Sequence, residues 1–272
     1  MPAPNPNPDP DPDPDPSSGL SFPANLSLFQ ISTILFDCDN TLVLSEEIAF
    51  EACADLINSI CAEHNVALPA PFTGETLFTE FVGQNFRGML NSLKTRYGLS
   101  ITDSQMEDYV KREEGAVIAK IETSLKPCVG VDQQLALLAA AGEKELSVVS
   151  SSAKRRVLAS IKKVGQNKYF PDEKVFSAAT SLPKPTSKPD PAVYLFALET
   201  LGKTAGECVA VEDSKTGTTS ANRAGIRVIG YTGPYPSEEK EKMAKVLTEA
   251  GANVVMDHWD QFPDMLAEIE AL

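Results

Sequence analysis

The sequence predicts an α/β protein with a doubly wound, parallel, Rossmann-like sheet as its core and an inserted helical cap domain. Three observations predict this fold. Short continuous apolar runs recur along the chain, helical patterns separate them, and the connection between the first two runs is far longer than an ordinary loop. Strands covered on both faces are continuously apolar, and strands that alternate with helices form parallel sheets.

The predicted strands are the apolar runs, and the last of them is expected at the sheet edge. They are residues 31–36, 146–150, 175–179, 208–212, 227–231 and 254–256. Helical patterns lie between the runs. These are residues 131–141, 153–164, 191–201 and 215–224. Parallel strands need crossover connections of this kind, so the alternation predicts a doubly wound sheet.

The cap is predicted for residues 45–125, and residues 26–44 and 126–272 form the predicted core. Loops between a strand and a helix have about two to six residues, so this connection must contain structure of its own. Ligands of open parallel sheets bind at the carboxyl ends of the strands. A domain inserted at that edge is therefore expected to cover the site as a lid.

Local signals in the cap predict where its helices begin and end. Ser45 is a candidate N-cap, because Ser is favoured there and two glutamates follow in the first turn. Gly83 and Gly98 are expected to stop helices, because glycine adopts the left-handed conformation of a helix end. Asp103 is predicted to open a long helix.

The N-terminal segment and the net charge limit the partners of the chain. Proline alternates with Asn or Asp in residues 1–25, which predicts a disordered, polyproline-biased tail. The formal net charge of −14 argues against nucleic acid as a ligand, because phosphate backbones are bound by basic surfaces. A small phosphorylated substrate is not excluded, since a few local Lys or Arg residues are sufficient to bind it.

The cysteines predict a reduced, cytoplasmic protein. They are scattered, odd in number and without a CxxC pair, at positions 38, 53, 61, 128 and 208. Cys38 is a poor nucleophile candidate, because the flanking carboxylates of Asp37 and Asp39 disfavour its thiolate. The N-terminus resembles no secretory signal, and no apolar run is long enough to span a membrane.

The stretch LFDCDNTLV carries the first chemical signal. Asp37 and Asp39 follow the apolar run 31–36, and residues two apart in a strand share a face. Mg²⁺ prefers carboxylate oxygens and water, so a cation would offset the cost of placing two carboxylates at a strand end. Asp37 could then attack an electrophile while Asp39 exchanges protons. A turn or N-cap is the alternative explanation of this motif.

Three further strand ends carry polar groups that suit a phosphate and a metal. Ser150 and the backbone N–H of Ser151 follow the second predicted strand and precede a helix, which is a favourable place for an anion. Lys188, rather than Lys184, directly precedes the helix start in KPDP and can neutralise developing charge. A further acid pair completes the set. Glu212 and Asp213 end a later strand and are candidate metal ligands.

Together these motifs resemble the haloacid dehalogenase superfamily of phosphotransferases. DCDNT matches the DxDx[TV] motif, and the serine after VV, the lysine of KPDP and the acid pair match the later motifs over residues 31–235. The branch most similar to the chain contains phosphoglycolate phosphatase, sugar-phosphate phosphatases and β-phosphoglucomutase. The second Asp is absent or replaced in dehalogenases, phosphonatases and P-type ATPases, so Asp39 favours a phosphomonoester as substrate.

The resemblance implies a Mg²⁺-dependent phosphatase that acts through an aspartyl-phosphate. Asp37 would attack phosphorus, and Asp39 would protonate the leaving oxygen and then activate water. Asp37, the backbone carbonyl of Asp39 and Asp213 would hold Mg²⁺, with Glu212 near that shell. A small sugar, polyol or glycolate phosphate is the expected substrate, and a monomer without nucleic-acid or membrane partners is the expected form.

The resemblance also implies which residues bind the phosphate, and the cap contains candidate contacts for the rest of the substrate. Ser150, Ser151 and Lys188 would bind the phosphoryl group, and Thr41 would help through its backbone and the turn that it shapes. Among cap residues, the candidate substrate contacts are Gln84, Asn85 and Arg87. Helix surface and an N-cap are the alternative roles of these three residues.

Two alternatives to a phosphatase remain open. A β-phosphoglucomutase-like enzyme would carry an Arg where the segment FVGQNFRGML has Phe86; Arg87 follows one position later, about 100° further round a helix. This departure weakens the mutase hypothesis. The second alternative is a non-catalytic binding or regulatory member of the family, which would be expected to lack a motif residue, whereas this chain retains all of them.

Overall fold

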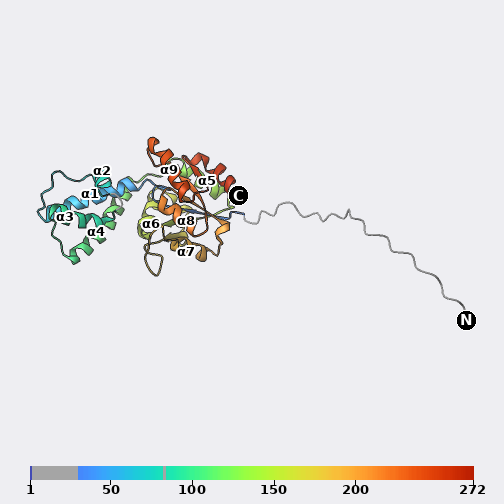
Figure 1. Ribbon diagram of the computed structural model, residues 1–272, viewed down its shortest axis with the longest axis horizontal. Helices are drawn as coiled ribbons and strands as arrows, with labels where there is room; N and C mark the ends of the chain where they lie inside the picture. The colour runs from blue at the N-terminus through green and yellow to red at the C-terminus, as the bar shows by residue number, and fades with distance from the viewer. Residues whose placement is uncertain (2–29, 82–83) are drawn as a thin grey trace.

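The computed structural model describes Met1, residues 30–81 and residues 84–272. An α/β core and a helical insert lie side by side, with the C-terminus on the core (Figure 1). Apart from Met1, the predicted N-terminal tail lies outside the described residues, as does Gly83, one of the predicted helix stops. None of the helices in the described ranges has the length and apolar character needed to cross a membrane.

Within the described residues the core sheet has six strands, all parallel, in the order β3-β2-β1-β4-β5-β6. The strands are β1 (Thr33–Phe36), β2 (Glu145–Ser150), β3 (Val175–Ser177), β4 (Cys208–Glu212), β5 (Arg227–Tyr231) and β6 (Val254–Met256). The predicted fold class is therefore confirmed, including the edge strand β6. The central strands β1, β2 and β4 end at the same level, because Phe36 is in register with Val148 and Val211.

Helices cover both faces of the sheet, which explains the continuous apolar runs. Successive strand residues point to opposite faces. Phe36 therefore belongs to one apolar cluster and Leu35 to the other. The first face is covered by α5 (Val131–Ala141), α6 (Lys154–Lys163) and α10 (Phe262–Ala271). The second face is covered by α7 (Ala192–Leu201), α8 (Lys215–Arg223) and α9 (Ser237–Ala250).

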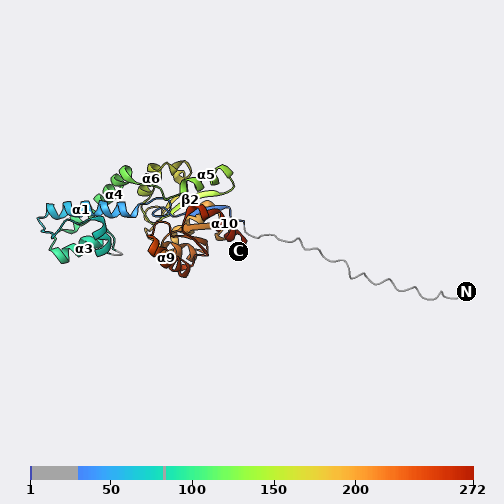
Figure 2. The ribbon, with the colours of Figure 1, turned by 90° about the horizontal axis from the view of Figure 1, so that it is seen from above.

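The helical insert lies between β1 and α5 in the chain. Its described helices are α1 (Glu46–Glu63), α2 (Gly74–Glu80), α3 (Phe86–Tyr97) and α4 (Asp103–Ser124). They enclose an apolar cluster of their own around Leu77, Phe81 and Leu90. The start of α1 and the end of α4 lie beside the sheet domain, and α4 packs against α6 (Figure 2). The insert therefore leaves and rejoins the core at the edge where β1 ends.

The predicted helix boundaries of the insert are largely confirmed. Gly98 ends α3 in the left-handed conformation, and α4 begins at Asp103 behind a capping box formed by Thr102 and Gln105. Ser45 precedes α1 as predicted, but its side chain makes no capping hydrogen bond. Its hydroxyl instead donates to the carboxylate of Asp39. The predicted capping role of Ser45 is wrong, because this carboxylate competes for the hydroxyl.

Candidate active site

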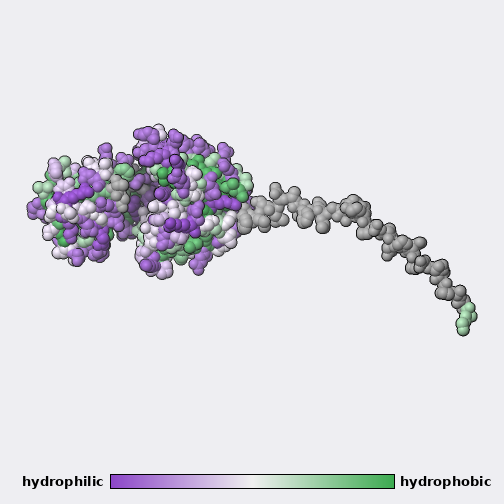
Figure 3. Space-filling view, in the orientation of Figure 1, coloured by the Kyte–Doolittle hydropathy of each residue, from purple (hydrophilic) through white to green (hydrophobic). Residues whose placement is uncertain are grey.

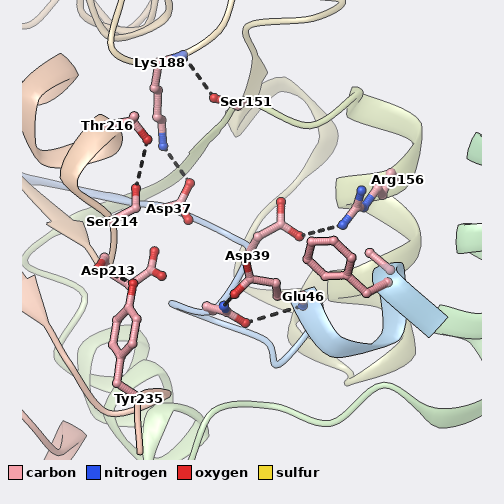
Figure 4. A pocket seen from close by; sticks show the side chains of 13 residues that line it. Asp37, Asp39, Glu46, Ser151, Arg156, Lys188, Asp213, Ser214, Thr216 and Tyr235 are labelled. Carbon is pink, nitrogen blue, oxygen red and sulfur yellow. Dashed lines mark hydrogen bonds and ion pairs between the residues drawn. The ribbon is translucent and has the colours of Figure 1, made fainter. Parts of the chain in front are cut away.

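A cavity of about 300 Å³ lies where the ends of β1, β2 and β4 meet the start of α1. The surface is hollowed between the insert and the core in the space-filling view (Figure 3). The cavity is lined by Asp37, Asp39, Asn40, Glu46, Ala49, Phe50, Ser151, Arg156, Lys188, Asp213, Ser214, Thr216 and Tyr235. Figure 4 shows that Lys188 and Asp213 lie beside Asp37, whereas Arg156 lies beyond Asp39 on the other side.

Lys188 links the carboxylates at the floor of this cavity. Its Nζ donates to Asp37 Oδ1 and to Glu212 Oε1, both at 2.6 Å, and to the carbonyl of Val149 at 2.8 Å. The backbone N–H of Lys188 donates to Ser151 Oγ at 3.1 Å, which ties the loop before α7 to the end of β2. Lys184 is exposed and does not line the cavity. The geometry therefore places Lys188, and not Lys184, at the predicted site.

The residues present fit a divalent cation. Asp37, Glu212 and Asp213 offer carboxylate oxygens that lie within 4.8 Å of one another, and all three residues are buried. Burial raises the pKa of Asp37 to about 7 although Lys188 opposes this, and burial with the neighbouring carboxylates raises the pKa of Asp213 well above its usual value. A cation would relieve this repulsion, and an all-oxygen donor set suits Mg²⁺.

Glu212 is fully buried and does not line the cavity. Its Oε1 accepts from Lys188 and from the Tyr194 hydroxyl, while its Oε2 finds no hydrogen-bond partner among the described residues. Gly217 at the start of α8 makes room for this carboxylate, because a Cβ there would lie 1.7 Å from Glu212 Oε2. Asp37 and Asp213 line the cavity itself, so they are the better placed of the predicted metal ligands.

Asp39 is held differently from Asp37. Its carboxylate accepts from Ser45, from Ser152 Oγ at 2.7 Å and from Arg156 Nη2 at 3.4 Å. Burial opposes the ionisation of Asp39, but Arg156 and the two hydroxyls outweigh burial and lower the pKa of Asp39. The two aspartates of one motif therefore have opposite pKa shifts in the metal-free structure: the Asp39 carboxylate is ionised and can accept a proton, whereas the raised pKa of Asp37 means that this nucleophile depends on a nearby cation to be fully ionised.

The two serines predicted to bind phosphate lie differently with respect to the cavity. Ser151 lines the cavity, but Ser150 does not: its side chain is buried and its Oγ accepts from the backbone N–H of Ser152 at 3.0 Å. The phosphate contacts of Ser150 and Ser151 both stay predictions, and of the two residues Ser151 is the one that lines the cavity. Thr41 is also buried, and its Oγ1 donates to Asp213 Oδ1 at 3.4 Å.

The predicted cap contacts lie in a neighbouring cavity of about 350 Å³. Gln84 accepts from Ser92 Oγ at 2.9 Å, and Asn85 is the N-cap of α3. Arg87 donates to both carboxylate oxygens of Glu107, at 2.7 and 2.8 Å. These hydrogen bonds support the alternative roles within the insert. All three residues line the second cavity, which meets the first at Ala49, Phe50 and Arg156.

Several residues of the site carry no sequence signal that identifies them. Arg156 lies in the first turn of α6, where its direction depends on how that helix packs. Tyr235 comes from the loop after β5, and its hydroxyl donates to the backbone carbonyl of Asp213 at 3.3 Å. Glu46 also lines the cavity, but from the sequence it is only a favourable acidic residue in the first turn of α1. The one signal for Arg156 is that it is a cation a few residues after the serines that follow β2 in the sequence.

Comparison with known proteins agrees with this geometry. The model of the haloacid dehalogenase-like hydrolase family matches residues 34–231. A phosphorylated carbohydrates phosphatase of Thermotoga maritima is 30% identical over 222 residues, which are 82% of this chain and 92% of the relative. The 6-phosphogluconate phosphatase of Escherichia coli is 27% identical over 202 residues, 74% of this chain and 83% of the relative.

A solved structure shows the same architecture. A candidate β-phosphoglucomutase from Thermotoga maritima superimposes with a TM-score of 0.65 at 27% identity, over 87% of this chain and 99% of that one. The chain belongs to the haloacid dehalogenase-like hydrolase family. The family resemblance predicted from the motifs is thus confirmed, and so is the prediction of an enzyme of the phosphatase class, since curated relatives are phosphatases of this family.

Proposed function

We propose that the protein is a Mg²⁺-dependent phosphomonoesterase that acts on a small phosphorylated carbohydrate through an aspartyl-phosphate on Asp37. One observation carries this proposal. Asp37, Lys188 and Asp213 converge on one cavity with Asp39 on its opposite side (Figure 4). A nucleophile, a phosphate-binding cation and a separate proton-transfer group are thereby available at a single point.

The first step uses the two aspartates in separate roles. A carboxylate oxygen of Asp37 attacks phosphorus, and the ester bond to the leaving oxygen breaks. The Asp39 carboxylate takes up a proton from solvent when the substrate binds and gives it to that oxygen, and in the second step it takes a proton from the water that attacks the aspartyl-phosphate. Phosphate then leaves and Asp37 is regenerated. The hydrogen bonds from Ser45 and Ser152 orient the Asp39 carboxylate for these transfers.

The remaining residues bind the phosphoryl group and the metal. Lys188 neutralises the phosphoryl oxygens, and Ser151 donates from its hydroxyl and backbone. Asp37, Asp213 and the backbone carbonyl of Asp39 would hold Mg²⁺, with Glu212 behind them. The cation would supply charge compensation for the phosphoryl oxygens and the carboxylates. Thr41 stabilises the turn after β1 through its contact with Asp213.

The relatives support a carbohydrate as the substrate class. The names of two of them describe phosphatases of phosphorylated carbohydrates and of 6-phosphogluconate. We extend this class to the present chain as sugar and polyol phosphates, while phosphoglycolate, which carries a carboxylate, stays a prediction from the sequence. The remaining sequence predictions, a cytoplasmic monomer without nucleic-acid partners, stay predictions.

The test is release of inorganic phosphate by the purified full-length protein. We expect turnover of p-nitrophenyl phosphate and of at least one sugar or polyol phosphate with Mg²⁺, and none in excess EDTA. The Asp37→Asn variant controls for a contaminating phosphatase. Activity that persists in EDTA would contradict the proposed metal dependence, and a protein that binds phosphorylated ligands without turnover would support the non-catalytic alternative.

The mutase alternative has one observation in its favour, the solved candidate β-phosphoglucomutase. Against it, a buried Phe86 takes the position of the Arg in the mutase pattern, and the next residue, Arg87, is paired with Glu107. Incubation with β-glucose 1-phosphate and glucose 1,6-bisphosphate separates the two reactions. We expect free phosphate; rapid formation of glucose 6-phosphate with little free phosphate would favour the mutase.

A further inference from the structure

The direction in which the substrate leaves the phosphate site follows from Asp39. The group that protonates the leaving oxygen must contact it, so the organic part of the substrate has to lie on the Asp39 side of the cavity. Arg156 contacts Asp39 and also lines the second cavity, toward the insert. The leaving group is therefore expected to pass Arg156 into that cavity.

A third cavity, of about 400 Å³, offers the competing direction. It opens near Tyr235, and four glutamates line it: Glu46, Glu47, Glu75 and Glu239. Neither Asp39 nor any side chain that donates a hydrogen bond to Asp39 lines this cavity. A leaving group placed there would lie away from its proton donor, so the second cavity is the better choice.

Two charged side chains that line the second cavity, Arg156 and Glu113, have unused hydrogen-bonding capacity. Arg156 uses Nη2 for Asp39, and its buried Nε–H finds no partner in the described part of the chain. Glu113, on α4 of the insert, accepts from the Cys53 thiol at 3.8 Å, which is a weak interaction. Burial lowers the pKa of Arg156, but the carboxylates of Asp39 and Glu113 outweigh it and raise the pKa.

The other polar groups of this cavity use part of their hydrogen-bonding capacity within the insert. Arg87 is bound by both oxygens of Glu107, and the side-chain oxygens of Gln84 and Asn85 accept hydrogen bonds within the insert. Glu113 and Arg156 are thus the charged groups with the most unused hydrogen-bonding capacity. One comes from the insert and the other from the core.

We propose that Glu113 and Arg156 form a hydroxyl-binding pair that selects neutral polyhydroxy phosphomonoesters, with Glu113 as a specificity-determining residue. This inference rests on the proposed phosphatase function and names its substrate class. A hydroxyl can accept from the guanidinium and donate to the carboxylate at the same time. A carboxylate on the substrate would be repelled, because the carboxylates of Asp39 and Glu113 already face the Arg156 guanidinium.

The test compares two substrates that share a six-carbon chain and a terminal phosphate. Sorbitol 6-phosphate carries a neutral hydroxyl where 6-phosphogluconate carries a carboxylate. We expect kcat/KM of the wild type to favour sorbitol 6-phosphate by about tenfold or more. Glu113→Gln keeps the shape but removes the charge, so it should reduce this preference about fivefold or more. Glu113→Leu should lower kcat/KM for sorbitol 6-phosphate about tenfold or more.

The controls separate specificity from structure. p-Nitrophenyl phosphate has no hydroxyl to bind, so its hydrolysis should stay within about twofold in both Glu113 variants. Glu114 is the matched control, because it neighbours Glu113 on α4 but does not line the cavity, and Glu114→Gln should leave the substrate preference unchanged. Melting temperatures report whether each variant is folded.

The outcomes distinguish this inference from the proposed function. Equal use of the two six-carbon substrates by the wild type, or an equal loss on all substrates in Glu113→Leu, would overturn the hydroxyl-binding pair while the phosphatase stands. An unchanged preference in Glu113→Gln would do the same. No Mg²⁺-dependent phosphate release from any substrate would overturn the proposed function, and this inference with it.

Discussion

The catalytic edge of the sheet and the helical insert both contain ion pairs, but of opposite kinds. At the sheet edge, Lys188 is buried between Asp37 and Glu212, and its side chain is 4% exposed. In the insert, Arg87 and Glu107 form a bidentate pair whose side chains are 42% and 57% exposed. Buried pairs are costly to break, whereas exposed ones contribute little. The catalytic side chains of the core are thus held in place, whereas the exposed side chains of the insert can rearrange to contact a substrate.

The largest expected effect comes from Asp37→Asn. The amide cannot attack phosphorus, so kcat is expected to fall by several powers of ten while the variant remains folded. Lys188 keeps its second partner, Glu212, in this variant, so the buried cation remains compensated. Single-turnover phosphate release and the circular dichroism spectrum check the two parts. Substantial turnover in a clean preparation would show that another residue is the nucleophile.

Lys188→Met tests the buried pair from the side of the cation. It leaves Asp37, Glu212 and Asp213 close together without their shared counter-charge, so we expect a loss of about 3–5 kcal/mol in the free energy of unfolding as well as loss of activity. Urea unfolding in EDTA measures the stability. Lys184→Met is the matched control, since Lys184 is exposed and should tolerate the change. A similar stability for the two variants would contradict the contrast between the regions.

The same contrast explains what sequence reasoning could and could not find. The strand ends were predictable, because continuous apolar runs followed by Asp37 or Glu212 depend only on chain order and strand geometry. Ser150 and Ser151 were harder to separate, since the direction of a side chain changes where β2 ends. The predicted capping role of Ser45 failed because the Asp39 carboxylate, brought near by the turn after β1, takes its hydroxyl.

Residues that act between the two regions were not predictable at all. Arg156 and Glu113 line the same cavity because α6 packs against α4, and no local pattern in either helix encodes that packing. The predicted cap contacts show a second difficulty. Asn85 and Arg87 have side chains that suit a ligand, but partners within the insert already occupy much of their hydrogen-bonding capacity. Tertiary packing decides which polar groups remain available, and one sequence does not show that packing.

A smaller effect is expected from pH in the metal-free protein. The pKa of Asp37 is about 7 in the folded state, above its ordinary value of 3.8, so between these values the unfolded chain binds fewer protons than the folded one. Stability in EDTA should therefore fall as the pH rises from about 4 to about 7. Asp37→Asn should show a shallower fall, and equal slopes for both proteins would contradict the assignment.

The metal should reverse this trend. Mg²⁺ binds ionised carboxylates, so it should raise the melting temperature more at pH 8 than at pH 5. Asp213→Asn should reduce the increase at pH 8, because Asp213 belongs to the same buried carboxylate cluster. Ca²⁺ should support turnover poorly, since it prefers a larger shell with more ligands. Thermal unfolding in EDTA, Mg²⁺ and Ca²⁺ at both pH values, with activity assays, checks these expectations.

The smallest effect is expected from breaking the exposed pair of the insert. Arg87→Gln and Glu107→Gln each remove one member of an ion pair that solvent already screens, so neither should change the melting temperature measurably. Their effects on substrate binding should differ, because Arg87 lines the second cavity and Glu107 does not.

The kinetic part of this prediction concerns KM. If Arg87 contacts the leaving group, Arg87→Gln raises KM for sugar phosphates and leaves KM for p-nitrophenyl phosphate unchanged. Glu107→Gln frees the guanidinium and should lower KM for acidic substrates such as 6-phosphogluconate. Equal KM values in both variants and the wild type would restrict Arg87 to its role on the helix surface, and a clear fall in melting temperature would show that the pair is not as weak as its exposure indicates.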